Sequence, residues 1–207
     1  MARAVTRNIS GMLQLATQGD ILDGVDWYKR AHRLGVRLIH AYDGLTLGQA
    51  VGVIAALSPN NKWTRNCVDA EAMIKAWYAG ADPMGVKVCT FNPNKAKAAA
   101  ILALTADNLE TDSIAEILNG RKVVAFYRSI MGDPDAVCVD GHAYSVWTGE
   151  RIPTTQTPSI GVKLYADIAR AYQLVAKRSY ELCGTTLTPT QVQAVTWVTY
   201  RRLLGYN

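Results

Sequence analysis

The stretch from Ile117 to Gly149, ILNGRKVVAFYRSIMGDPDAVCVDGHAYSVWTG, constrains the fold of this chain more than any other. It predicts a helix, a tight turn at Asn119-Gly120, a second helix and a short acidic loop. Asparagine and glycine both tolerate positive φ, which such a turn requires. Gly132-Asp133-Pro134 ends the second helix because proline cannot continue a helix. Asp140 then opens a further helix.

Apolar residues elsewhere recur with the period of a helix, and no stretch alternates as a strand does. Residues 24–42 predict an amphipathic helix with a basic face at residues 29–37, which is either solvated or phosphate-binding. Thr46 caps a helix that runs to Leu57, and Thr188 begins a capping box at the last helix. We therefore expect about eight to ten helices and an all-α fold.

Two segments at the ends of the chain have a less definite pattern. Residues 1–20 predict only a short, loosely held helix, and residues 159–182 predict one long helix. With no linker-like or low-complexity segment between them, residues 1–207 are expected to form a single all-α domain.

Composition excludes several classes of protein. Hydrophobic residues make up 49% of the chain and charged residues 19%, which are globular values. No apolar run is long enough for a membrane helix, and no signal-peptide core is present at the N-terminus, so we expect a cytoplasmic protein of a bacterial or phage-infected cell. The net charge of +5 is compatible with a polyanionic partner.

The cysteines and acidic residues do not predict a metal site. Cys67, Cys89, Cys138 and Cys183 contain no C-x-x-C pair, so we expect reduced thiols and no zinc or iron–sulfur cluster. Asp133, Asp135, Asp140 and His142 match no compact chelating motif. We expect no cofactor.

Residues 118–122, LNGRK, resemble the hairpin of the helix-hairpin-helix DNA glycosylase superfamily, with the helix-hairpin-helix at about 112–132. Residues 139–142, VDGH, resemble that superfamily's catalytic aspartate segment, usually V-D-T-H. Lys122 lies 18 residues before Asp140, where bifunctional members carry a nucleophilic lysine. The hairpin is two residues shorter than the usual L-P-G-V-G, and Gly141 replaces threonine. The resemblance covers residues 45–149.

The resemblance implies two helical lobes with a central cleft, and a monomer that acts on double-stranded DNA. Such an enzyme flips a modified or damaged base and cleaves its N-glycosidic bond. Asp140 would stabilise the positive charge that develops on the sugar. Lys122 would form a Schiff base that leads to strand cleavage. In the alternative reading, Asp140 only caps a helix and Lys122 is a surface or phosphate-contacting residue.

Further residues are candidates for DNA contacts through their position or chemistry. Asn60 or Asn61 would occupy the space that the flipped base leaves, and Trp63 and Tyr127 would stack on that base or belong to the core. The other candidates for DNA contacts are Lys62, Arg65, Asn119, Gly120, Arg121 and His142. Gln193 and Trp197, on the last helix, are expected in the core.

Two other functions remain open. The segments DWYKRAH, SPNNKW and QAVTWVTYRR resemble those of divergent, often phage-encoded relatives. Some of these relatives are associated with hypermodified pyrimidines, so the reaction could be transfer of a group onto an activated base in DNA. A non-catalytic DNA-binding module would need neither Asp140 nor Lys122. An assay of base release separates these functions.

Overall fold

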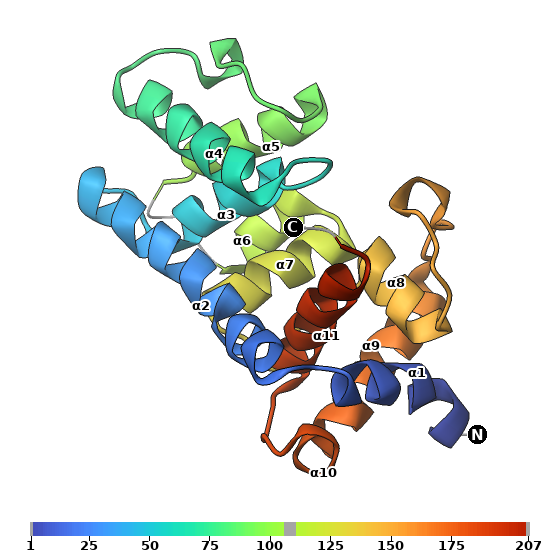
Figure 1. The fold of residues 1–207 in the computed structure, drawn as a ribbon. Coiled ribbons are helices and arrows are strands. Elements are labelled where there is room, and N and C mark those ends of the chain that lie inside the picture. The colour runs from blue at the N-terminus through green and yellow to red at the C-terminus, as the bar shows by residue number, and fades with distance from the viewer. Residues whose placement is uncertain (1, 106–110, 206–207) are drawn as a thin grey trace. The chain divides into compact units, whose positions relative to one another are not determined.

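The structure is a computed structural model that describes residues 2–105 and 111–205 (Figure 1). Throughout these residues every regular element is a helix, which confirms the all-α prediction. The α-helices are α1 (Ala2–Gln14), α2 (Gln18–Ala41), α3 (Leu47–Leu57), α4 (Trp63–Tyr78), α5 (Asn92–Leu102), α6 (Thr111–Leu118), α7 (Arg121–Met131), α8 (Gly141–Thr148), α9 (Val162–Ala176), α10 (Ser179–Cys183) and α11 (Pro189–Leu203). Short 3₁₀ helices are η1 (Pro83–Gly85) and η3 (Thr154–Gln156).

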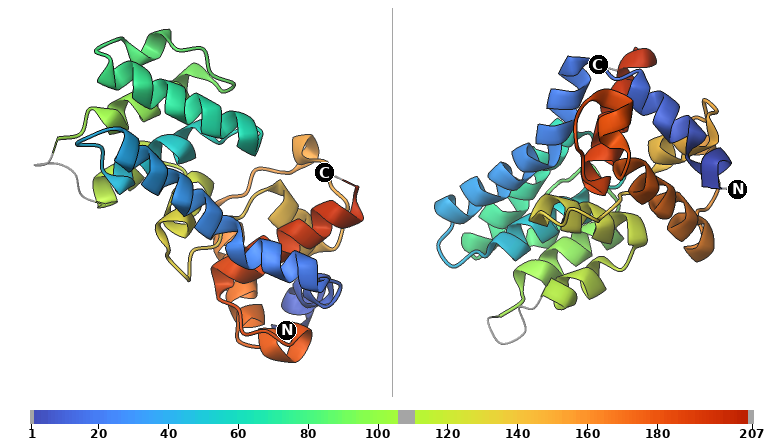
Figure 2. Two further views of the ribbon diagram at one scale, coloured as in Figure 1. Left: turned by 60° about the vertical axis from the view of Figure 1, so that its left-hand side comes forward. Right: turned by 90° about the horizontal axis from the view of Figure 1, so that it is seen from below.

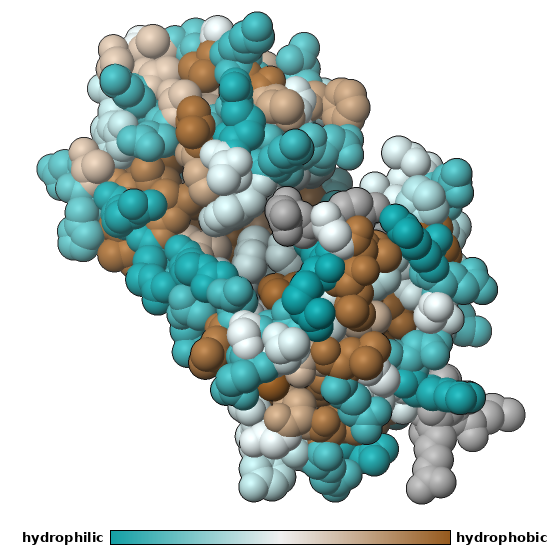
Figure 3. Space-filling view, in the orientation of Figure 1, coloured by the Kyte–Doolittle hydropathy of each residue, from teal (hydrophilic) through white to brown (hydrophobic). Residues whose placement is uncertain are grey.

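The chain forms two compact units, each helical (Figure 2). The middle unit is Arg30–Met131, and the terminal unit combines Met1–Lys29 with Gly132–Asn207. The helix α2 carries residues of both units. Hydrophilic side chains cover much of α2 in the view of Figure 3, and Lys29 and Arg37 on its predicted basic face are exposed. Of the helices in the described ranges, none combines the length and apolarity needed to cross a bilayer.

The middle unit is built around α3, which packs against α4, α5, α6 and α7. Every residue from Gln49 to Leu57 is buried. Gly52 permits the close packing, because a Cβ there would lie 2.9 Å from Ile114 Cγ2 and 3.1 Å from Ile101 Cγ2. Thr46 caps α3, as the sequence predicts, and it does so through a capping box with Gln49.

The terminal unit buries a core contributed by α1, α8, α9 and α11. The expectation that residues 1–20 are loosely held is wrong. Ile9 and Leu13 are 0% exposed, and both belong to this core. Their spacing of four residues places them on one face of α1, and partners far along the chain bury that face. Packing against helices distant in sequence therefore holds α1 in place, and the sequence of residues 1–20 alone does not reveal it.

The long helix predicted for residues 159–182 is also interrupted. α9 ends at Ala176, and the short α10 begins at Ser179. The Ser179 hydroxyl is buried and accepts a hydrogen bond from the Leu187 N–H at 2.8 Å. This bond returns the chain toward Thr188, where the predicted capping box begins α11.

Gly24 of α2 lies directly against the backbone of α11 in the terminal unit. A Cβ at this position would lie 2.5 Å from the Cα of Val195 on α11. Backbone atoms cannot move aside as a flexible side chain can, so only glycine fits without a shift of one helix.

We predict that Gly24→Ala lowers the free energy of unfolding by about 1–3 kcal/mol through overpacking. Gly11→Ala in α1 is the control, because its Cβ would meet nothing within 4 Å. The control should stabilise the protein by about 0.5–1 kcal/mol through helix propensity. Urea denaturation measures both values, and equal effects of the two substitutions would contradict the close approach at Gly24.

Candidate active site at the start of α8

The loop that leads to Asp140 is fixed from both sides. The Thr190 hydroxyl of α11 lies 2.8 Å from the Asp133 carbonyl oxygen and 2.6 Å from that of Ala136. The Tyr165 hydroxyl of α9 donates to the Val137 carbonyl at 2.8 Å and accepts from the Val139 N–H at 3.2 Å. The residue before Asp140 is therefore held in place by hydrogen bonds as well as by its burial.

Asp140 is the N-cap of α8 and is partly exposed. Its Oδ1 accepts a hydrogen bond from the Ala143 N–H at 2.8 Å. Its Oδ2 lies 3.3 Å from Nδ1 of His142, and the two side chains are 22% and 24% exposed. The carboxylate is thus oriented by the helix that it caps, and the positive end of the helix dipole favours its negative charge.

Tyr172 lies beneath the same helix and is fully buried. Its hydroxyl donates to the Ala143 carbonyl at 3.4 Å. Burial raises the pKa of Tyr172, a hydrogen bond with Thr196 lowers it, and the nearby charge of Asp140 raises it further. Tyr172 therefore stays protonated and acts as an uncharged support below the carboxylate.

The presence of glycine at position 141, directly after Asp140, has a structural cause. A Cβ on Gly141 would lie 2.7 Å from the Thr157 hydroxyl oxygen and 3.2 Å from Cγ2 of Thr154. These threonines belong to the segment around η3, which follows α8 along the chain. A hydroxyl from another segment therefore occupies the space beside Asp140 that a side chain at position 141 would fill.

Aromatic side chains gather beside His142 and form what we call the aromatic cluster. The ring of His142 contacts those of Trp197 and Tyr200 edge to face, with centroid distances of 6.3 Å and 6.0 Å. Trp27 contacts Trp197 at 5.7 Å and Tyr28 at 4.9 Å. The members of the cluster are Trp27, Tyr28, His142, Trp197 and Tyr200.

Two polar groups accompany the aromatic cluster. Cζ of Arg201 lies 4.6 Å from the centroid of the Trp197 ring. The Tyr28 hydroxyl donates to Oε1 of Gln193, which is 4% exposed, at 2.8 Å. We expected Gln193 and Trp197 in the core, and Gln193 is buried, but Trp197 is only half-buried. Their spacing of four residues places both on one face of α11. This spacing was the feature of the sequence that could have shown that the two residues lie together.

The predicted hairpin lies in the middle unit, between α6 and α7. Asn119 has a φ of 41°, and Gly120 completes the turn. The Lys97 Nζ donates to the Leu118 carbonyl at 2.6 Å, which ties α5 to the end of α6. Arg121 and Lys122 are exposed in the first turn of α7.

The segment between α3 and α4 is tied down by Asp69, which is 1% exposed. Its carboxylate accepts hydrogen bonds from Nδ2 of Asn61 at 3.0 Å, Nε of Arg65 at 2.6 Å and the Cys89 N–H at 2.7 Å. Asn61 is thereby anchored inward. Asn60, with a φ of 58°, is the exposed residue of this turn.

The remaining candidates of the middle unit differ in exposure. Lys62 is exposed at the N-cap of α4, and Trp63 is half-buried beside it. Tyr127 is 1% exposed and lies in the core near Gly48. Its burial leaves no ring face open to a base, because the residues around α3 already cover both faces.

The structure therefore brings together only part of the predicted set. Asp140 and His142 belong to the terminal unit and are in contact. The other candidates, including Lys122 and the hairpin, belong to the middle unit. No group of three His, Cys, Asp or Glu side chains that could hold a metal ion occurs among the described residues. The four cysteines are free thiols.

The chain belongs to a protein family of unknown function, DUF7178, which matches residues 1–203. No curated protein and no solved structure matches the chain. The case for a function therefore depends on the residues of the site.

We predict that replacing Asp140 separates its capping role from its charge. Asp140→Ala should lower the free energy of unfolding by about 1 kcal/mol because the Ala143 N–H loses its acceptor. Asp140→Asn should cost only a few tenths of a kcal/mol, since asparagine is an equally good N-cap. Thermal or urea denaturation measures both. A loss with Asn as large as with Ala would show that the charge, and not the cap, stabilises the fold.

Proposed function

We propose that this protein is a DNA glycosylase, which flips a modified or damaged base out of double-stranded DNA and cleaves its N-glycosidic bond. The observation that supports this proposal best is the Asp140 carboxylate. It is fixed at a helix start by the Ala143 N–H and lies beside His142, yet it keeps 22% of its surface exposed. The order of helix, Asn-Gly turn, helix, buried loop and carboxylate adds to this support.

Asp140 suits the chemistry because cleavage of the glycosidic bond builds positive charge on the sugar. A carboxylate with one oxygen held by the backbone cannot turn away, so its field is organised before the reaction begins. Its second oxygen, next to His142, can orient an attacking water or accept its proton. The C1′–N bond breaks as the nucleophile, which is either this water or the amine of Lys122, bonds to C1′, and the base leaves with the bonding electron pair.

The aromatic cluster is the part of the terminal unit best suited to receive a flipped base. Flipped bases are held by stacking on aromatic side chains and by hydrogen bonds to their edges. Trp197 supplies a half-buried ring next to His142, and Gln193 supplies an amide on the same helix. This set replaces Tyr127, which is buried in the middle unit.

The middle unit offers groups for the DNA backbone. The Asn119-Gly120 turn precedes the N-terminus of α7, and exposed Arg121 is the first residue of that helix. Backbone N–H groups at such a helix start suit a phosphate, whatever the DNA sequence. Exposed Lys62 adds a further cation. Asn60, the exposed residue of its turn, is the better candidate to fill the space of the flipped base, because Asn61 is bound to Asp69.

We predict that Asp140→Asn retains DNA binding and loses at least about 10²-fold in the rate of base release. The test incubates duplexes that carry diverse modified bases with the protein and detects released bases by mass spectrometry. Asp167→Asn, on an exposed residue of α9, makes the same charge change and should keep the full rate. Undiminished turnover by Asp140→Asn would refute the assignment.

The same assay distinguishes the two other functions. DNA that gains mass without loss of a base would indicate group transfer onto a modified pyrimidine. Binding to DNA without turnover of any substrate would indicate a non-catalytic module.

We predict that Lys122 is the nucleophile, because its amine stands directly after the hairpin. Attack on C1′ would give a Schiff base, which borohydride reduces to a stable protein–DNA adduct. Lys122→Ala should abolish this adduct and leave binding largely intact, since one lysine accounts for about one phosphate contact. Lys75→Ala, on an exposed residue of α4, should still form it. Base release with no trapped adduct would assign the attack to water.

A further inference from the structure

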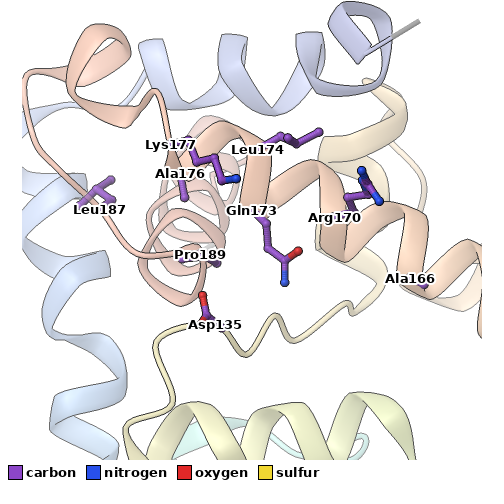
Figure 4. Close-up of a pocket in the computed structure, with 9 residues that line it drawn as sticks. All are labelled: Asp135, Ala166, Arg170, Gln173, Leu174, Ala176, Lys177, Leu187 and Pro189. Atoms are coloured by element: carbon purple, nitrogen blue, oxygen red, sulfur yellow. The ribbon is translucent and has the colours of Figure 1, made fainter.

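A hollow with a volume of about 840 Å³ lies in the terminal unit between α9, the loop after α7 and the start of α11 (Figure 4). Arg170 and Gln173 line it from α9, and Lys177 lines it from the C-cap of that helix. Asp135 lines it from the loop, and Leu187 and Pro189 from the segment that begins α11. None of these residues belongs to the candidate active site.

The polar residues of the hollow are arranged by the helix. Arg170, Gln173 and Lys177 are spaced by three and four residues, and the C-cap Lys177 keeps a right-handed helical backbone, so the three lie on one side of α9 and its end. Arg170 and Lys177 stand about 10 Å apart along the axis, at 1.5 Å per residue. Gln173 extends between them into the space above the loop that carries Asp135 (Figure 4). Arg170 and Lys177 form no ion pair with any residue that the structure describes.

The walls of the hollow are fixed without a ligand. The opposite face of α9, with Ile168, Tyr172 and Val175, is buried in the core. The Thr190 hydroxyl holds the loop at Asp133 and Ala136, on both sides of Asp135. The capping box at Thr188 fixes the start of α11. A ligand would therefore meet a largely preformed site, which lowers the entropy cost of binding.

The chemistry of the lining favours a ligand that carries a phosphate group at one end and a hydrogen-bond donor at the other. Two cations and an amide on α9 suit a phosphate group. The carboxylate of Asp135 suits a hydrogen-bond donor, and Leu187 and Pro189 supply apolar surface. The carboxylate would repel a continuous polyanion, so the lining favours a small molecule over the DNA backbone. The volume lies within the range of small-molecule sites.

We propose that this hollow is a binding site for a nucleotide-sized organic phosphate. The phosphate lies against Arg170 and Lys177, and a donor group of the sugar or base reaches Asp135. The site is separate from Asp140, so it stands whether or not the protein is a glycosylase.

The test is calorimetric titration of the full chain with the four deoxynucleoside 5′-monophosphates, the matching deoxynucleosides and inorganic phosphate. At least one monophosphate should bind, and its deoxynucleoside should bind at least tenfold more weakly. The double substitution Arg170→Gln and Lys177→Gln should weaken monophosphate binding by at least tenfold. The control is Lys163→Gln, an exposed lysine seven residues before Arg170 and outside the hollow, which should leave the affinity unchanged.

A third variant tests the other end of the ligand. Asp135→Asn should weaken binding of the monophosphate and strengthen binding of inorganic phosphate, because it removes a repulsive charge. Circular dichroism verifies that every variant stays folded. Absence of binding by all four monophosphates at millimolar concentration would overturn the proposal. An affinity of the double variant for the monophosphate equal to that of the unmodified protein would also overturn it. So would a loss of affinity for a short DNA duplex in the double variant that matches its loss for the monophosphate, because this result would identify the DNA backbone as the source of the phosphate.

Discussion

The hydroxyl of Thr190 is the contact on which the arrangement of the terminal unit depends most. It reaches the carbonyl oxygens of Asp133 and Ala136 and so joins the start of α11 to the loop after α7. Tyr165 holds the same loop from α9. Because hydrogen bonds fix the loop at several points, two of its parts are held in defined positions. Its end presents Asp140 at the start of α8, and its middle presents Asp135 to the hollow beside α9.

Local chemistry explains what the sequence could predict. Thr46 and Thr188 form capping boxes with the residue three positions on, and Asn119-Gly120 forms its turn, because each depends on neighbours in sequence. The all-α class follows from the same periodicity. The position of Asp140 at a helix start was also visible, because aspartate is a preferred N-cap and a buried segment precedes it.

What the sequence could not predict depends on partners far along the chain. The face of α1 with Ile9 and Leu13 looks weak alone and is buried only by distant helices. The aromatic cluster joins Trp27 to Trp197. Asn61 and Arg65 were predicted as DNA contacts, and their shared hydrogen-bond partner, the buried carboxylate of Asp69, could not be read from the sequence. Tyr127 was a plausible stacking residue until the packing of α3 placed it in the core. In each case the sequence shows the type of the residue, but it does not show which distant residues surround it in the fold.

The division of the chain has a consequence for how the protein forms during synthesis. The middle unit is one continuous segment, so all of its contacts become available once residue 131 has left the ribosome. The terminal unit joins the two ends of the chain, as the ion pair between Asp20 and Arg202 illustrates. Closing so long a loop is slow unless an intervening domain has already brought the ends closer. The middle unit, once folded, shortens the free chain between the two ends. The candidate site at Asp140 can therefore assemble only after α11 has been synthesised, because this helix supplies Thr190 and part of the core of the terminal unit.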